Sequence, residues 1–311
     1  MITHRLALLA GVATALAVVP AAASAGAAQD RYTTIDVPGA TATFAATVND
    51  AGVVVGFYTD GHGTTRGFVD RSGVFTTVND PLAGTAAGQG TFLDCINDRG
   101  VMVGYYVAKS GAFHGFIDRR GVFTTVNDPH AGTAEFQGTF LACINNSGVI
   151  AGGYIDARYV SHGFIDRRGA FTTVNHRHAG TAAGQGTGLG YINDHGAVSG
   201  TYINSRGKAV SFAGRPGAFT TVTDPAAVPF STFAGAINNS GVIVGLSTDT
   251  HGVSHGFIDQ AGVFTPLNDP HAGTASGQGT QAQDISNSGV IVGTYFDSSG
   301  GQHGFELSPS R

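Results

Sequence analysis

Short apolar segments alternate with turns rich in Gly, Asn and Asp along almost the whole chain. A representative stretch has an apolar segment at 139–144, the polar turn 145–148 and a second apolar segment at 149–154. Asn and Asp favour tight turns, and a following Gly supplies a positive φ, so this pattern predicts a β-hairpin. No window combines helical periodicity with capping residues. The pattern therefore predicts an all-β protein.

Two markers recur in the same register and show that the chain contains six copies of one repeat unit. A phenylalanine preceded by Gly or Ser recurs at spacings of 48, 48, 48, 45 and 48 residues, at Phe68, Phe116, Phe164, Phe212, Phe257 and Phe305. A polar turn that begins with an apolar residue and Asn or Ser recurs in the same register, and it ends at Gly52, Gly100, Gly148, Gly196, Gly241 and Gly289. Internal repetition at this period predicts a repeat architecture.

Each unit has the pattern of four short strands. In the third unit we expect strands at 139–144, 148–154, 162–166 and 171–174, followed by a polar connection to the next unit. Four strands in about 48 residues is the size of one blade of a β-propeller. The second strand is continuously apolar, as in Val53–Val55, which fits a sheet covered on both faces by neighbouring blades.

The two ends of the repeat region complete each other. Tyr32–Pro38 matches the fourth strand of a unit, whereas the last unit stops after its third strand, near Phe305. An N-terminal strand that completes the last blade would close the ring and cover both exposed sheet edges. We therefore predict a single six-bladed β-propeller of four-stranded blades over residues 31–308, followed by a short tail, 309–311.

The units resemble the HAF repeat, a family of probable extracellular bacterial proteins named after a His-Ala-Phe core. The central residue is Gly instead of Ala, and Arg66 and Ser211 replace the His in two units. The resemblance covers the whole repeat region, and it implies an exported repeat protein without mapped catalytic residues. The segments that carry it are His114–Phe116, His162–Phe164, His255–Phe257 and His303–Phe305.

Residues 1–25 have the pattern of a secretory signal peptide. Arg5 precedes an apolar run at 6–19, and small residues lead to Ala23–Ala25. The run is shorter than the ~20 residues that a helix needs to span a bilayer. We therefore expect cleavage, a short linker at 26–30, and a secreted or periplasmic protein.

Charge and composition narrow the range of partners. Only 12% of the residues are charged, and the formal net charge is −5. This balance argues against a nucleic-acid partner or an anionic membrane surface. The sequence after residue 25 contains no apolar span long enough to cross a membrane. We expect a soluble monomer.

Polar side chains recur where each connection between units enters the next first strand. Four connections end in Gln-Gly-Thr, and three carry a histidine at one shared position. At the mouth of a propeller channel these groups could bind a polar ligand such as a sugar. The alternative, which we favour for the amides and hydroxyls, is that they satisfy buried backbone groups. The candidate ligand-binding residues are Gln89, Thr91, Gln137, Thr139, Gln185, Thr187, Gln278, Thr280, His130, His178 and His271.

The histidines do not predict a metal site. Equivalent histidines of different blades would lie one blade apart, too far to converge on a metal at ~2.0–2.1 Å. The histidines of the His-Gly-Phe segments are expected to hydrogen-bond a loop of a neighbouring blade. The Asn-Asp-x-Gly turns lack the ligand run of a calcium-binding EF-hand loop. We therefore expect no metal and no cofactor.

One position in the first strand varies among the units. Cys95 and Cys143 occupy it in adjacent units, and Asp284 occupies it in the last. Facing sheets lie ~10 Å apart, whereas a disulfide needs Cα atoms within about 7 Å, so we expect two buried free thiols. Asp284 is expected to be a buried acid that is hydrogen-bonded to the backbone.

The residues favour an exported, non-catalytic binding or scaffold propeller that recognises a small polar ligand or a glycan at the channel mouth. One alternative is an extracellular lyase or hydrolase that uses His and Asp at the same face. Another is a purely structural surface protein without a ligand. The fold by itself does not separate these functions, because propellers host all three.

Overall fold

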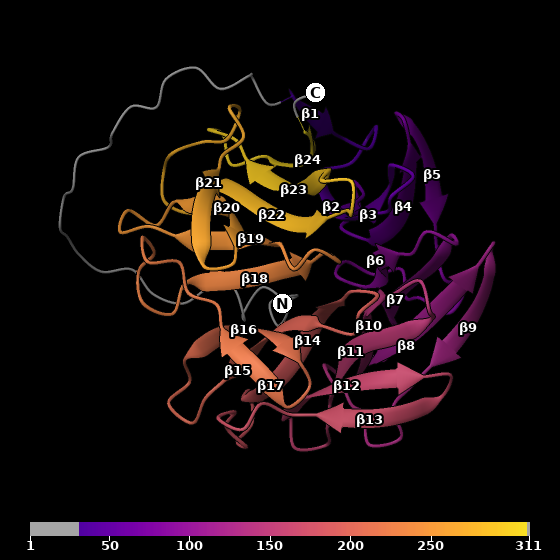
Figure 1. Cartoon of the computed structure of the whole chain (residues 1–311). Helices are drawn as coiled ribbons and strands as arrows, with labels where there is room; N and C mark the ends of the chain where they lie inside the picture. Colours follow the sequence, from indigo (N-terminus) through magenta and orange to yellow (C-terminus); the bar gives the residue numbers. More distant parts are fainter. Residues whose placement is uncertain (1–30, 310–311) are drawn as a thin grey trace.

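Six four-stranded blades surround a central axis in the computed structural model (Figure 1). The model describes residues 31–309, so the predicted leader, the linker 26–30 and residues 310–311 lie outside the described range. Between residues 31 and 309 every regular element is a β-strand, and no helix is present that could cross a membrane. The prediction of an all-β, six-bladed propeller is confirmed.

The strands of each blade are arranged from the axis outward. The innermost strands are β2 (Ala42–Val48), β6 (Gly90–Ile96), β10 (Gly138–Ile144), β14 (Gly186–Ile192), β18 (Thr232–Ile237) and β22 (Gly279–Ile285). The second strands are β3 (Val53–Thr59), β7 (Val101–Val107), β11 (Val149–Ile155), β15 (Val198–Ile203), β19 (Ile243–Thr248) and β23 (Ile291–Phe296). The third strands are β4 (Thr65–Arg71), β8 (Phe113–Arg119), β12 (Ser161–Arg167), β16 (Ala209–Arg215), β20 (Ser254–Gln260) and β24 (Gln302–Ser308). The outermost strands are β5 (Val74–Val78), β9 (Val122–Val126), β13 (Ala170–Val174), β17 (Ala218–Thr221), β21 (Val263–Leu267) and β1 (Arg31–Ile35).

The N-terminal strand completes the last blade. β1 pairs antiparallel with β24 in a register that places Thr34 opposite Phe305 and Arg31 opposite Ser308. The ring of Tyr32 lies 5.6 Å from that of Phe305, between centroids. The ring is therefore closed by the pairing that the sequence predicts, and β24 has no free edge.

The repeated phenylalanine is the core residue of each blade. Phe164 is fully buried, as are its five counterparts. It lies beneath Gly152 of β11, where an added Cβ would come within 2.3 Å of the Phe140 carbonyl oxygen and 2.9 Å of the Phe164 ring. The glycine therefore admits the phenylalanine ring and the neighbouring strand at the same point. This packing explains why both residues recur in every unit.

Glycines of the Gln-Gly-Thr motifs join neighbouring blades. Gly90 pairs in parallel with Thr65, at the start of the preceding blade's third strand, and three other junctions repeat this bridge. Gly90 has a φ of 127°, and a Cβ there would lie 1.9 Å from the Thr65 carbonyl oxygen, so only glycine fits. The junctions between blades four and five and between blades six and one lack the motif, and the sheet pairing is interrupted there.

Candidate binding site

The propeller has two faces, which carry different loops. The turn face carries the hairpins that join the first to the second strand and the third to the fourth strand of each blade. The connection face carries the hairpins between second and third strands and the connections from one blade to the next. The predicted ligand residues lie in or beside these connections, so they belong to the connection face.

A ring of asparagines links the blades around the axis on the turn face. Asn145 is typical: its Oδ1 accepts hydrogen bonds from the backbone N–H groups of Ser147 and Val149, and its Nδ2 donates to the Asn193 carbonyl of the next blade at 3.1 Å. Asn49, Asn97, Asn193 and Asn238 make the same link at 2.9–3.5 Å. The turn chemistry that we expect from sequence therefore also ties each blade to the next.

A second ring, formed by the residue that follows in each turn, is continuous. The backbone N–H of each member donates to the side-chain Oδ1 of the equivalent residue in the next blade, at 2.7–2.9 Å. The last link runs from Asn287 of blade six to Asp50 of blade one, so the ring closes. Its members are Asp50, Asp98, Asn146, Asp194, Asn239 and Asn287. These carboxylates and amides are engaged by the fold, and residues 31–309 hold no cluster of three or more metal-ligating side chains.

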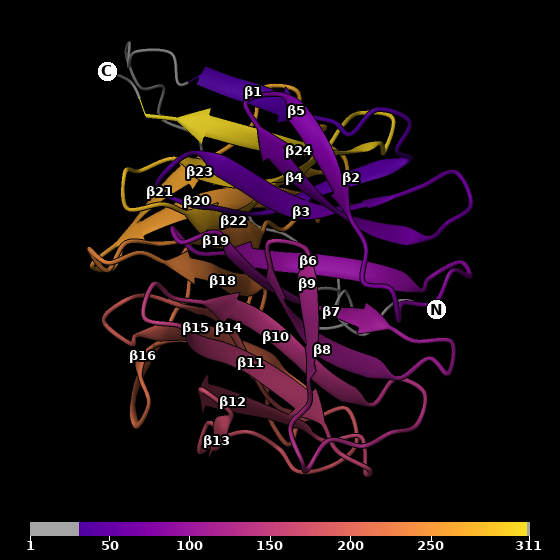
Figure 2. The same ribbon diagram turned by 90° about the vertical axis from the view of Figure 1, so that its right-hand side faces the viewer.

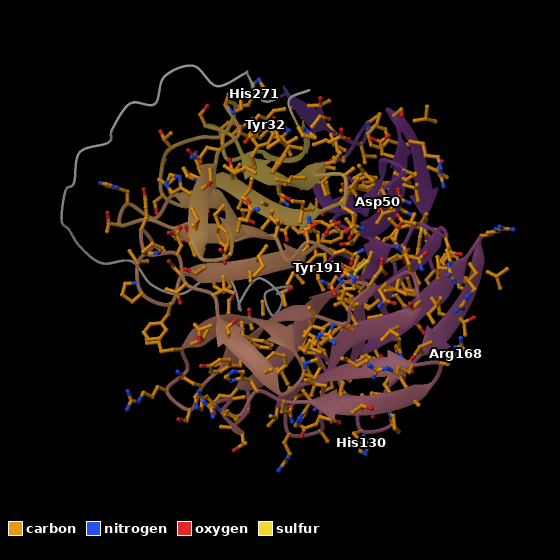
Figure 3. All side chains as sticks on the ribbon, in the orientation of Figure 1. Tyr32, Asp50, His130, Arg168, Tyr191 and His271 are labelled. Carbon is orange, nitrogen blue, oxygen red and sulfur yellow. A yellow bond between two sulfur atoms is a disulfide. The ribbon has the colours of Figure 1, made fainter. Side chains whose placement is uncertain are left out.

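Tyr191 closes the axis itself. Its hydroxyl donates a hydrogen bond to the Ala46 carbonyl at 3.0 Å, from blade four to blade one on the opposite side of the ring. Figure 3 shows its side chain near the centre of the molecule. A cavity of about 80 Å³ lies among the turns around it. This space, at the turn-face end of the axis, is too small for a sugar ring.

Cys95 and Cys143 form a disulfide, so the prediction of free thiols is wrong. Their Cα atoms are 4.9 Å apart, and both residues are buried. The ~10 Å spacing used for the prediction applies to the packed faces of neighbouring sheets. The innermost strands converge toward the axis, and there equivalent residues of adjacent blades come within bonding distance. The bond ties β6 of blade two to β10 of blade three.

Asp284 is the buried acid at the same position in blade six. Its Oδ2 accepts a hydrogen bond from the Val48 backbone N–H of blade one at 2.9 Å. Burial raises the pKa of Asp284 from 3.8 to about 7, against the opposing effect of hydrogen bonds from the Val48 and Ile285 backbone. The backbone hydrogen bond expected from sequence is therefore present, and it spans the junction where the ring closes.

The Gln and Thr side chains of the Gln-Gly-Thr motifs bond to backbone groups of the connections, which is the alternative that the sequence favours. Each Gln Oε1 accepts a hydrogen bond from the backbone N–H three residues earlier, at 3.0–3.3 Å, in Gln89, Gln137, Gln185 and Gln278. Each Thr Oγ1 accepts one from the backbone N–H eleven residues earlier, at 2.8–2.9 Å, in Thr91, Thr139, Thr187 and Thr280. The four threonines are at most 1% exposed. Both side chains thus hold the connections in place at the blade junctions.

Two of the three predicted histidines, His130 and His271, lie at the outer part of the blade junctions. In Figure 3, His130 and His271 are at the perimeter of the molecule, far from Tyr191. The His130 side chain is 72% exposed and its Nδ1 lies 3.1 Å from Asp128 Oδ1; the corresponding values for His271 and Asp269 are 62% and 3.0 Å. Asp128 and Asp269 are buried. In each of these two connections, a buried carboxylate therefore contacts an imidazole that is exposed to solvent.

His130 and His271 each face an aromatic pair of the next blade. The His130 ring lies 6.2 Å from that of Tyr154, which stacks on His162 at 4.8 Å. At the last junction His271 lies 6.2 Å from Tyr295, which stacks on His303 at 4.9 Å. We call each set of connection His and Asp with the facing Tyr and His a junction cluster. The sequence did not predict the contact between the connection histidine and the tyrosine, because these residues belong to neighbouring blades.

Histidines of the His-Gly-Phe segments bond within their own blade, so the expected contact with a neighbouring loop is wrong. Asn175 Nδ2 donates to His162 Nδ1 at 3.1 Å, which directs the Nε2 proton toward Asp156 Oδ2 at 3.4 Å. Asn175 follows the outermost strand of the same blade, and Asp156 belongs to its connection-face hairpin. The residue after the outermost strand and the hairpin between the second and third strands therefore both contact His162.

Charge differs between the junction clusters. His303 lies 2.9 Å from Asp36 and 3.3 Å from Asp297, and although burial opposes them, these carboxylates raise the pKa of His303. At the junction between blades three and four, His176 stands where the others have Asp and stacks on Tyr202 at 4.0 Å. Burial, with His178 and Arg177 nearby, lowers the pKa of His176. The two complete clusters, at His130 and His271, therefore carry a carboxylate, and the His178 cluster does not.

Comparison with known proteins shows the fold and nothing finer. No protein-family model matches the chain, and no curated protein matches it. The structure of AofleA from Arthrobotrys oligospora is similar, with 12% identity, a TM-score of 0.58, and coverage of 92% of this chain and 88% of that one. TolB from Acinetobacter baumannii is 11% identical with a TM-score of 0.54, over 84% of this chain and 65% of that one. A fungal lectin, Aleuria aurantia lectin, described as a six-bladed β-propeller with a fucose recognition mode, is 13% identical with a TM-score of 0.48, over 87% and 95%.

Proposed function

We propose that the protein is an exported, non-catalytic propeller that binds small polar, hydroxyl-rich ligands such as saccharides at its junction clusters. The observation that carries this proposal is the repetition of one cluster: an exposed imidazole held by a buried Asp faces a Tyr–His pair of the next blade at two junctions. A third junction carries the same exposed histidine, His178, in a variant form. The signal peptide expected at residues 1–25 supports the export.

The chemistry of the cluster suits a sugar better than an apolar ligand. Imidazole nitrogens both donate and accept hydrogen bonds, which matches hydroxyl groups. The tyrosine is buried, so the exposed imidazole is the ring available to a ligand. Several equivalent sites on one rigid ring increase the avidity for a ligand that repeats, as the sugars of a glycan do.

Leucine at His130 and His271 tests the proposal. The first junction already carries Leu82 at this position, and its backbone N–H bonds Asp80 at 2.8 Å as that of His130 bonds Asp128. His130→Leu with His271→Leu is therefore expected to fold with an unchanged melting temperature. On a glycan array and by calorimetry, we expect the wild type to bind a saccharide and the double variant to bind it about tenfold more weakly or not at all.

A matched control uses two exposed histidines outside the clusters. His62 and His251 lie in connection-face hairpins of blades one and five. His62→Ala with His251→Ala should bind as the wild type does. Equal binding by the cluster variant and the wild type would refute the proposed site. No saccharide binding by the wild type at millimolar concentration would refute the proposed function.

A further inference from the structure

Charge is distributed very unevenly among the blades. From Pro216 to Pro309 the chain has no lysine or arginine and seven acidic residues. After Arg31, all lysines and arginines of the described range lie between Arg66 and Arg215, in blades one to four. Blades one to four are therefore richer in arginine than the net charge of −5 for the whole chain suggests.

Six arginines stand on one kind of hairpin. They lie at the turn-face hairpins between third and fourth strands, and all six are exposed. None of them makes an ion pair with any residue in 31–309. We call them the arginine rim: Arg71 in blade one, Arg119 and Arg120 in blade two, Arg167 and Arg168 in blade three, and Arg215 in blade four.

The acidic residues of the hairpins in blades one to three do not neutralise the rim. Asp118 is 2% exposed, and its Oδ1 accepts a hydrogen bond from the Gly121 N–H at 2.6 Å; Asp166 is 3% exposed and makes the same contact with Gly169. These carboxylates point into the blade, whereas the guanidinium groups point to solvent. The positive charge of the rim therefore remains available to a partner.

Two of the arginines occupy a backbone conformation that does not favour them. Arg120 and Arg168 have φ values of 57° and 59°, in the left-handed region where Asn or Gly would be less strained. Blade five has Ala261 at the same position with a φ of 53°, so the hairpin itself does not need an arginine. An exposed arginine in a strained backbone conformation, with no ion-pair partner among residues 31–309, suits contact with an external partner.

The rim follows the outer edge of the ring. Figure 3 shows Arg168 at the perimeter, where the hairpin leads into β13. Figure 2 shows β5 and β9 one after the other along the outer side of the molecule. The arginines of consecutive blades are thus placed along a convex, curved line.

We infer that the arginine rim binds a linear polysaccharide that carries carboxylate or sulfate groups. Guanidinium groups bind both anions in bidentate geometry. A flexible polymer can follow the curved rim, whereas a flat membrane or a stiff nucleic-acid duplex would reach only one or two hairpins. The rim hairpins carry no exposed aromatic side chain on which single-stranded bases could stack. This site and its ligand are distinct from the junction clusters.

Blade five has an uncharged hairpin at the equivalent position, and its sequence can replace the arginines in a test. Arg119→Gln, Arg120→Ala, Arg167→Gln and Arg168→Ala together give blades two and three the Gln260–Ala261 sequence of blade five. The probes are polygalacturonate, which carries carboxylates, dextran sulfate, and neutral dextran. We expect the wild type to bind at least one anionic polymer more weakly as salt rises from 50 to 300 mM, and the variant to bind about tenfold more weakly with an unchanged melting temperature.

A control removes the same number of positive charges from the opposite face. Lys109→Gln, Arg177→Gln, Arg206→Gln and Lys208→Gln lie in exposed loops of the connection face and should leave binding unchanged. An equal loss in both variants would show unspecific attraction and overturn the proposal. So would tighter binding of single-stranded DNA or anionic vesicles than of either polymer, or no polymer binding at 50 mM salt. The variant with leucine at His130 and His271 should retain polymer binding, which separates this site from the junction clusters.

Discussion

Removal of the Cys95–Cys143 disulfide is expected to lower the free energy of unfolding by about 2–4 kcal/mol. The bond joins residues 48 positions apart, so it restricts a long loop in the unfolded chain. In the chain-entropy account, a loop of this length corresponds to about 4 kcal/mol, and native-state effects reduce such values in practice. The loss should appear in urea unfolding of the Cys95→Ala/Cys143→Ala variant.

The wild type under strong reductant is the matched comparison for this variant. Both cysteines are buried, so part of any loss in the variant could come from removed side-chain packing. The reduced wild type keeps both sulfur atoms and isolates the contribution of the bond. Equal unfolding midpoints for the reduced and the oxidised wild type, with reduction verified by thiol titration, would contradict the prediction.

Asp284→Asn is expected to stabilise the propeller at pH 8 and to leave its stability nearly unchanged at pH 4. The pKa of Asp284 is about 7 in the folded protein, against 3.8 for the ordinary carboxyl. Between these values the folded state holds a proton that the unfolded state releases, so the stability that this group supplies is complete below pH 3.8 and is lost as pH rises through 7. The difference corresponds to about 4 kcal/mol at pH 8 as an upper value. Asparagine stays neutral and can still accept the Val48 N–H bond.

The reverse behaviour is expected of Asp194, which serves as a control. Although burial opposes them, hydrogen bonds from Asn239 and Asn146 lower the pKa of Asp194. Its contribution is therefore present above the ordinary carboxyl pKa and is lost as pH falls. Asp194→Asn should be destabilising at pH 8 and less so at pH 3, by urea unfolding across this range. A difference between Asp284→Asn and wild type that does not change from pH 4 to 9 would refute the account.

The fold could be predicted because its determinants are local and repeated. The glycine that ends each polar turn, the buried Phe164 and its counterparts, and the match of Tyr32–Pro38 to a fourth strand are all visible as sequence spacing. Six copies of one pattern reduce the ambiguity of any single strand, and the missing fourth strand at the end of the chain predicts the closure that β1 makes with β24.

The disulfide could not be predicted from repeat register alone. Equivalent positions in adjacent blades are far apart near the perimeter and close together near the axis. The distance between Cys95 and Cys143 therefore depends on how closely the innermost strands converge. A spacing taken from ordinary sheet packing gives the wrong answer at this radius.

The candidate site was predicted in part. The recurrence of His130, His178 and His271 marked the connections, and the alternative that the Gln side chains satisfy backbone groups matches the hydrogen bond that Gln89 accepts from the Ala86 N–H. Tyr191 crosses the axis, and the Gln-Gly-Thr motifs lie between blades. The contact of His130 with Tyr154 joins residues of two different blades, which no spacing within one unit can indicate.

The sequence by itself determined the strand pattern, the number of blades and the way the ring closes, because turn chemistry and burial act over a few residues and recur in every unit. Only the tertiary structure decided which side chains meet: the disulfide, the contact of Tyr191 with Ala46 across the axis, the junction clusters and the arginine rim. These depend on the radius and face at which each residue lies once six blades are arranged around one axis, and distance from that axis is not encoded in position along the chain.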